Sequence, residues 1–169
     1  EEQLIMDPKV LRERFWNMFI VDALIGNWDR HNGNWGFLYD QATDEMTLAP
    51  VYDCGSCLYP QADETIMTAI LEDPAERNQR IFDRPLSGIK QGGQKINYYR
   101  FISSLENRDC NAALKRIYPR ITVPDLTKLI EETPLIGELQ KQFYLTMLLE
   151  RREKILQYSL ERLKKREKR

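Results

Sequence analysis

Cysteine is scarce in this sequence, and its scarcity limits the class of protein. Three Cys in 169 residues cannot all pair within one chain, and they are too few for a disulfide scaffold. Proteins that leave their thiols unpaired are typical of reducing compartments. The sequence therefore predicts a cytoplasmic protein.

Long apolar runs are also missing. No stretch of about 18 or more consecutive apolar residues is present, so the sequence predicts no membrane-spanning helix. Eight Gly and eight Pro are too few for a fibrous protein, and a hydrophobic content of 42% is too high for a disordered one. We expect residues 1–169 to form a single globular domain. The chain begins with Glu1 and shows no signal peptide, which suggests a piece cut from a longer protein.

Periodicity predicts a mainly α fold with one short β-hairpin. A helix should begin at Pro8 and run to about Leu24, because apolar side chains recur at helical spacing between them. The polar residues 26–34 then predict a loop. Alternating segments follow at 35–39 and 46–52, and we expect them to pair as the hairpin.

The sequence after Asp63 has a helical pattern with one exception. Residues 82–95 are rich in Gly, Pro and Lys and lack periodicity, which predicts a mobile loop. Helices are predicted over residues 63–77, 97–107 and 109–118, and Pro74 should end the first of them early. A capping box at Thr122 should open a further helix that Pro134 stops, and a long helix should begin at about Gly137. The basic end of the last helix is interpreted as a solvated surface, with no direct nucleic-acid contact expected.

Three polar side chains flank the predicted hairpin. Asp29 and Asn34 lie in the loop before it, and Asp53 follows it. A hairpin returns its ends to one place, so Asn34 and Asp53 should lie near each other. Their oxygen atoms suit a hard cation such as Mg²⁺, which also binds phosphate oxygens. With Asp29 as an acceptor for a hydroxyl proton, the set predicts phosphoryl transfer.

Each of these residues also has a structural alternative. Asp and Asn often cap backbone amides in loops, and Asp53 could be a turn residue before Gly55. His31, the only His, could orient Asp29, contact phosphate or be structural. Arg30 is expected to support a carboxylate rather than bind phosphate.

Cys54 and Cys57 form a Cys-x-x-Cys pair that admits a zinc or redox role. Zinc would need two more ligands, for which Cys110 and His31 are the remaining candidates. A redox pair would need a βαβ setting that the pattern lacks. We expect these cysteines to be small buried side chains.

Residues 24–56 resemble the catalytic segment of the HipA-like kinases, which are atypical Ser/Thr kinases with a mostly helical C-terminal lobe. The similarity covers Leu24–Asn27, the Asp and the Asn five residues later, the hairpin and the Tyr52-Asp53 pair. The resemblance implies a kinase-like C-terminal lobe that uses ATP and Mg²⁺. It also implies Asp29 as catalytic base and Asn34 and Asp53 as Mg²⁺ ligands.

Two features depart from that pattern. Many HipA-like members carry Asp where this sequence has Arg30, and Asp29-Arg30-His31-x-x-Asn34 is also similar to phosphoinositide 3- and 4-kinases. The nucleotide-gripping part is absent as well, because no Gly-x-Gly-x-x-Gly follows a strand and no strand Lys with a helix Glu partner is evident. We expect the missing N-terminal lobe upstream, and this chain alone to be inactive.

The sequence thus predicts the catalytic lobe of a HipA-like Ser/Thr kinase acting on a protein hydroxyl. Its expected partners are ATP, a protein substrate and the N-terminal lobe, on the same or a separate chain. The resemblance adds a DNA-binding antitoxin-like protein as a candidate partner. The alternatives are a lipid-kinase lobe, a non-catalytic kinase-like binding module, and the zinc or redox protein.

Overall fold

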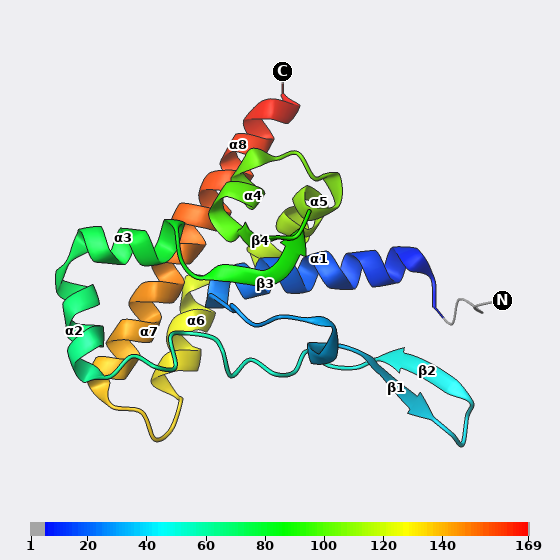
Figure 1. Cartoon of the computed structure of the whole chain (residues 1–169), viewed down its shortest axis with the longest axis horizontal. Coiled ribbons are helices and arrows are strands. Elements are labelled where there is room, and N and C mark those ends of the chain that lie inside the picture. The colour runs from blue at the N-terminus through cyan, green and yellow to red at the C-terminus, as the bar shows by residue number, and fades with distance from the viewer. Residues whose placement is uncertain (1–5, 169) are drawn as a thin grey trace.

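The computed structural model describes residues 6–168, and they form a mainly α-helical structure with two antiparallel hairpins (Figure 1). The expected fold class is confirmed, but the number of hairpins is two rather than one. The elements in chain order are α1 (Pro8–Ile25), the 3-10 turn η1 (Asn32–Asn34), β1 (Phe37–Asp40), β2 (Glu45–Leu48), α2 (Glu64–Glu72), α3 (Pro74–Phe82), β3 (Leu86–Gln91), β4 (Gln94–Asn97), α4 (Tyr98–Ser104), α5 (Arg108–Ile117), the 3-10 turn η2 (Tyr118–Arg120), α6 (Val123–Glu131), α7 (Glu138–Arg151), the π-helical segment η3 (Arg152–Gln157) and α8 (Tyr158–Glu167).

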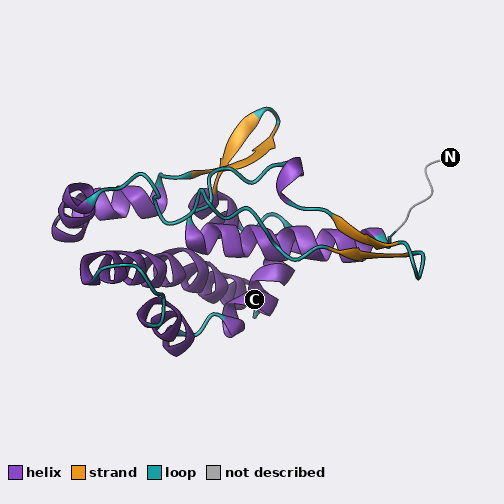
Figure 2. Cartoon of the chain, turned by 90° about the horizontal axis from the view of Figure 1, so that it is seen from below, coloured by secondary structure: helices purple, strands orange, loops and turns teal. Residues whose placement is uncertain are grey.

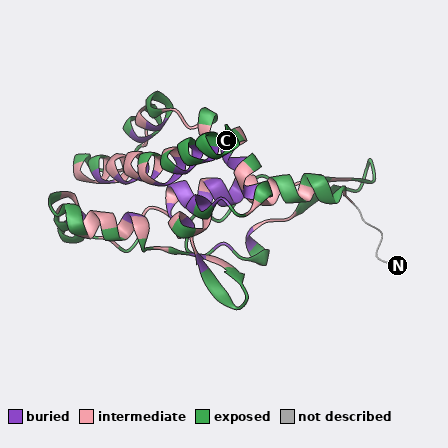
Figure 3. Cartoon of the chain, turned by 90° about the horizontal axis from the view of Figure 1, so that it is seen from above, coloured by how far each residue is buried: buried purple, intermediate pink, exposed green. Residues whose placement is uncertain are grey.

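Helix α1 has the limits that its capping residues dictate. The Asp7 side chain accepts a hydrogen bond from the Lys9 amide at 2.8 Å, and Pro8 occupies the first turn. Gly26 ends the helix in the left-handed conformation, with φ 66°. The predicted end at Leu24 is therefore one residue short of the observed end. The C-terminal half of α1 is buried in the body of the molecule (Figure 3).

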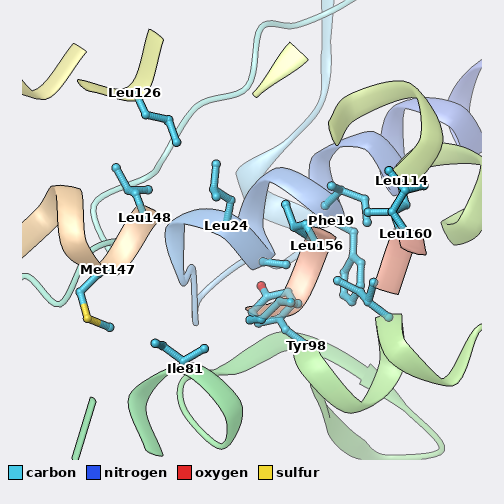
Figure 4. Close-up of a cluster of buried hydrophobic side chains, with 14 of the residues drawn as sticks. Phe19, Leu24, Ile81, Tyr98, Leu114, Leu126, Met147, Leu148, Leu156 and Leu160 are labelled. Atoms are coloured by element: carbon cyan, nitrogen blue, oxygen red, sulfur yellow. The ribbon is translucent and has the colours of Figure 1, made fainter. Parts of the chain in front are cut away.

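Segments α7, η3 and α8 form one helical rod that crosses the molecule beside α1 (Figures 1 and 2). The predicted long helix from Gly137 is confirmed, with a π-helical insertion over six residues. The core lies between this rod and α1. Figure 4 shows its members, which include Phe19, Leu24, Ile81, Tyr98, Leu114, Leu126, Met147, Leu148, Leu156 and Leu160.

The first hairpin extends from the body in the same direction as the N-terminal half of α1 (Figures 1 and 2). Its register pairs Phe37 with Leu48 and Asp40 with Glu45. The predicted hairpin is confirmed, although β2 ends at Leu48 and residues 49–52 are not strand. The side chains of β1 are exposed, so this strand is held by its pairing and its flanks rather than by the core.

The prediction of a mobile loop over residues 82–95 is wrong. Most of this stretch forms a second hairpin, β3 and β4, in which Gln91 pairs with Gln94. Gly92 and Gly93 make the two-residue turn at φ values of 56° and 81°. Two consecutive positive φ values match the twist of an antiparallel pair, and Gly reaches them without strain. The Gly-Gly pair therefore indicated a hairpin turn.

Pro74 begins a helix as well as ending one. Helix α2 stops at Glu72, and the Asp73 side chain accepts hydrogen bonds from Ala75 and Glu76 at the start of α3. The single helix expected over 63–77 is therefore two helices, because Pro is well suited to a first turn. None of the helices within residues 6–168 combines the length and the apolar character that a membrane span requires.

Replacement of Leu114 by Ala tests the core. Leu114 is completely buried on α5, so the substitution should lower the free energy of unfolding by about 2–5 kcal/mol. Leu129, which is 63% exposed on α6, supplies the matched Leu→Ala control, with a change within about 0.5 kcal/mol. Urea unfolding followed by circular dichroism measures both. Equal losses for the two variants would contradict this description of the core.

Candidate active site

The centre of the predicted site is a buried ion pair between Asp22 and Arg30. Arg30 donates from Nε to Asp22 Oδ2 at 2.9 Å and from Nη2 to Oδ1 at 3.0 Å. The Asp22 side chain is 0% exposed and the Arg30 side chain is 1% exposed. Burial acts to lower the pKa of Arg30, but the hydrogen bonds and charge of Asp22 outweigh it and raise that pKa above its ordinary value. Arg30 is therefore fixed in its charged form and supports a carboxylate, as expected.

Arg30 also holds two parts of the site together. Its Nη1 donates to the main-chain oxygens of Asn34 and Tyr52, each at 2.7 Å. Asn34 closes the loop before the first hairpin, and Tyr52 immediately precedes Asp53 after it. Both ends of the hairpin segment are thus within hydrogen-bond distance of one nitrogen atom. We call this arrangement the Arg30 clamp.

Two asparagines fix the loop that carries Asp29. Asn27 donates to Asp22 at 2.9 Å, and its own side-chain oxygen accepts from the Asp29 amide at 3.1 Å. Asn34 Nδ2 donates to the Asp29 carbonyl at 2.9 Å. The main chain of Asp29 is therefore held on both sides, and the orientation of Asn34 leaves Oδ1 as the amide atom available to a cation.

The hydroxyl of Tyr98 is hydrogen-bonded to the loop that carries Asp29. It donates to the main-chain oxygen of Asn27 at 2.6 Å, and Tyr98 is 1% exposed at the start of α4. Burial raises the pKa of Tyr98, so its hydroxyl stays protonated and remains a donor.

The carboxylates of Asp29 and Asp53 belong to exposed residues, whereas Asn34 is buried. Asp53 has φ 54°, a left-handed conformation that Asp tolerates better than most residues. Within residues 6–168, neither carboxylate forms a hydrogen bond or ion pair that would occupy it. The clamp thus brings the segments of Asp29, Asn34 and Asp53 together and leaves both carboxylates open to a ligand.

The His31 side chain caps the 3-10 turn that follows it in the loop. Its Nδ1 accepts a hydrogen bond from the Gly33 amide at 3.0 Å and so caps η1. Among the described residues, its hydrogen bond runs within the loop and not to Asp29. Nε2 of this exposed side chain remains the atom that could contact a ligand.

The second hairpin packs directly on the loop. A Cβ added to Gly88 of β3 would lie 2.6 Å from the Arg30 carbonyl oxygen and 2.9 Å from the Arg30 nitrogen. These are main-chain atoms and cannot move aside cheaply. Gly88 is therefore required for the close approach of β3 to residues 29 and 30.

The three cysteines differ in burial and in what surrounds their thiols. Residues 6–168 contain no group of three or more His, Cys, Asp or Glu side chains that could hold a metal ion. Burial raises the pKa of the Cys57 thiol, whereas a redox-active thiol needs a lowered one. Cys54 is exposed, contrary to expectation, and Cys110 is buried. Cys54 Sγ accepts a long contact from Arg30 at 3.6 Å.

The fold and site define a class of protein. Residues 3–124 match the family model of the HipA-like C-terminal domain. This is more than half of the chain, so the chain belongs to that family, as the sequence motif implied.

The chain is similar to the serine/threonine-protein kinase CtkA of Helicobacter pylori. The two are 48% identical over 157 residues, which cover 92% of this chain and 48% of the relative. The crystal structure of the Helicobacter pylori proinflammatory kinase CtkA superposes with a TM-score of 0.91 at 47% identity, covering 95% of this chain and 59% of that one. The chain therefore spans about half the length of the curated relative that it matches.

Asp22, Tyr98 and Gly88 belong to the site but were not among the residues that the sequence predicted for it. Asp22 carried a signal, because it is a charged residue within the apolar end of α1, where an unpaired charge would be costly. Tyr98 and Gly88 carried none, since their contacts join residues far apart in the sequence.

The ion pair can be tested by replacing Asp22 with Ala. The variant leaves a charged Arg30 without its partner in the interior, which should lower the free energy of unfolding by about 3–5 kcal/mol. The control is Glu76→Ala, which removes the partially exposed ion pair with Arg80 and should cost less than about 1 kcal/mol. Chemical denaturation measures both, and a small loss for Asp22→Ala would show that the clamp does not depend on the pair.

The close approach of β3 can be tested with Gly88→Ala. The added methyl group must push β3 away from residues 29 and 30, so stability should fall by about 1–3 kcal/mol. Gly36→Ala is the control, because an added Cβ there meets only the Tyr52 hydroxyl at 3.6 Å. Thermal unfolding compares them. Equal stability of the two variants would count against the contact.

Proposed function

We propose that this chain is the catalytic C-terminal lobe of an ATP- and Mg²⁺-dependent Ser/Thr protein kinase that transfers phosphate to a protein hydroxyl. The Arg30 clamp is the observation that carries the proposal, because it holds the loop of Asp29 and Asn34 beside the segment of Asp53. Phosphoryl transfer depends mainly on such positioning and on charge stabilisation. Membership of the HipA-like family and similarity to a named Ser/Thr kinase support it.

Asp29 would act as the catalytic base. Its main chain is fixed by Asn27 and Asn34, and its carboxylate belongs to an exposed residue. An accessible carboxylate on a fixed main chain can orient a substrate hydroxyl and accept its proton during transfer.

Asn34 and Asp53 would hold Mg²⁺. An amide oxygen and a carboxylate are hard oxygen donors, and two protein ligands suit an ion that also binds water and phosphate oxygens. The bound ion would neutralise charge on the phosphates. His31 would contact a phosphate through Nε2, since its Nδ1 is engaged by Gly33.

A second lobe would complete the nucleotide site. We place ATP between this chain and an N-terminal lobe, because the matched relative is about twice as long as the region it shares with this chain. The activity is therefore proposed for the full-length protein, and this chain alone should not transfer phosphate.

Replacement of Asp29 by Asn tests the base. In the full-length protein, turnover should fall roughly 10²- to 10⁴-fold, while affinity for Mg²⁺-ATP stays nearly constant, because only the proton acceptor is lost. Transfer of labelled phosphate from ATP, including autophosphorylation, measures turnover. Asp109→Asn, an exposed substitution on α5, is the matched control. Unchanged turnover in Asp29→Asn would remove Asp29 from this role.

Asp53→Asn tests the metal site separately. The variant should weaken Mg²⁺-dependent nucleotide binding in calorimetry, because the ligand loses its charge. Equal affinity would contradict the assignment. Absence of transfer by the folded wild type would instead favour a non-catalytic binding module.

A further inference from the structure

A pocket that takes no part in the site described above contains, in its wall, the residue that immediately precedes the proposed base. Its volume is about 530 Å³. One wall contains Trp28, which immediately precedes Asp29, and another consists of residues 59–62, which follow the Asp53 segment. Helix α2, Arg80 of α3, residues 84–86 and Lys95 of β4 complete it. The pocket is thus lined by the neighbour of Asp29 in the sequence and by a segment that begins six residues after Asp53, and we call it the acceptor pocket.

The interior of the acceptor pocket is apolar. Among its lining residues, Ile70 on α2 is 1% exposed, while Trp28, Ile66 and Leu86 remain 38%, 41% and 38% exposed. Large apolar side chains that converge on a cavity and stay accessible are typical of a binding site for an apolar group. The volume is sufficient for one or two aliphatic or aromatic side chains.

The charged residues around the pocket are all basic. Arg80, Arg84 and Lys95 line it, and its lining contains no Asp or Glu. Arg80 pairs with Glu76, but within residues 6–168 neither Arg84 nor Lys95 forms a salt bridge. Lys95 also lies directly opposite Lys90 in the second hairpin, and like charges in that position repel each other. An anionic partner would relieve this repulsion.

Arg151 is a buried cation that contacts the lining residue Arg80, and its charge is positive like that of the basic residues around the pocket. Arg151 is 1% exposed and donates to the carbonyl oxygens of Ala23 at 2.8 Å and Arg80 at 3.0 Å. Its Nη2 has no hydrogen-bond partner in the structure of residues 6–168. Since Arg151 pairs with no carboxylate there, its charge is offset only by carbonyl dipoles, and it adds to the positive potential of the wall.

We infer that the acceptor pocket binds an acidic segment of the protein substrate, with an apolar side chain of that segment in the cavity and Asp or Glu against Arg84 and Lys95. The inference rests on the proposed kinase function, which places the phosphate acceptor at Asp29. The apolar interior favours a polypeptide over the polyhydroxylated head group of a phosphoinositide. Charge complementarity selects an acidic rather than a basic segment.

Peptide substrates test the inference in the full-length protein. The probes are Ser peptides in which a Leu near the Ser is flanked by Glu or by Lys, together with versions that carry Ala in place of Leu. The Glu peptide with Leu should have a kcat/KM roughly 10-fold above that of the Lys peptide, because its charges complement two unpaired cations. Equal or reversed preference would overturn the inference.

The double variant Arg84→Glu/Lys95→Glu should lower kcat/KM for the Glu peptide by roughly 10-fold or more, chiefly through KM, without changing the KM for ATP. The matched control is Lys164→Glu/Lys165→Glu, which makes the same change of net charge at two exposed residues of α8 that do not line the pocket. Ile66→Ser should remove the preference for Leu over Ala. A double variant that behaves as the control does would contradict the placement of the acidic segment.

A binding measurement separates this inference from the proposed function. Fluorescence anisotropy with labelled Glu and Lys peptides that carry Ala in place of Ser requires no phosphate transfer. If the wild type binds the Glu peptide and the double variant does not, the result would support the pocket even if the protein transferred no phosphate. Transfer without any charge preference would refute the pocket and leave the kinase. Phosphorylation of phosphoinositide vesicles, with no binding of either peptide, would overturn the pocket and favour a lipid substrate.

Discussion

The buried pair of Asp22 and Arg30 is the interaction on which the candidate site depends. Asp22 is part of α1, so the carboxylate that anchors the pair has the rigidity of the central helix. Arg30 then fixes the main chain at Asn34 and at Tyr52 through hydrogen bonds from one guanidinium nitrogen. The Arg30 charge is stabilised at this depth because each of its nitrogen atoms finds an acceptor and Asp22 supplies the opposite charge. The planar fork of Arg can satisfy three such partners at fixed angles, which Lys could not do.

Other elements pack against the loop and the helix that contain this pair. The second hairpin covers the loop at Gly88, Tyr98 closes it from α4, and Arg151 joins the rod of α7, η3 and α8 to the end of α1. Positions that are distant in sequence therefore converge on a few loop residues. The arrangement is a rigid support under exposed functional groups, which is what positioning of a phosphate acceptor requires.

The acceptor pocket extends the same organisation to the substrate. Trp28 and Asp29 are consecutive residues, yet one contributes to an apolar cavity and the other carries an accessible carboxylate. A segment bound in the pocket would therefore present its neighbouring hydroxyl to the base. Catalysis and choice of substrate would share one loop, and the basic charges around the cavity would decide which segments enter it.

Local patterns in the sequence were sufficient for α1, the first hairpin, the long C-terminal helix and the polar loop, because caps, turns and periodicity act over a few residues. They also indicated Asp29, Asn34 and Asp53 as one group, since a hairpin joins its ends. The second hairpin was mistaken for a loop, although its Gly-Gly turn is local, because its strands lack clear alternation. Only the tertiary structure decided that Asp22 is the partner of Arg30, that Gly88 must be Gly, and that Trp28 lines a basic and apolar pocket. Those outcomes depend on contacts between residues remote in sequence, which chain packing selects and no short-range pattern encodes.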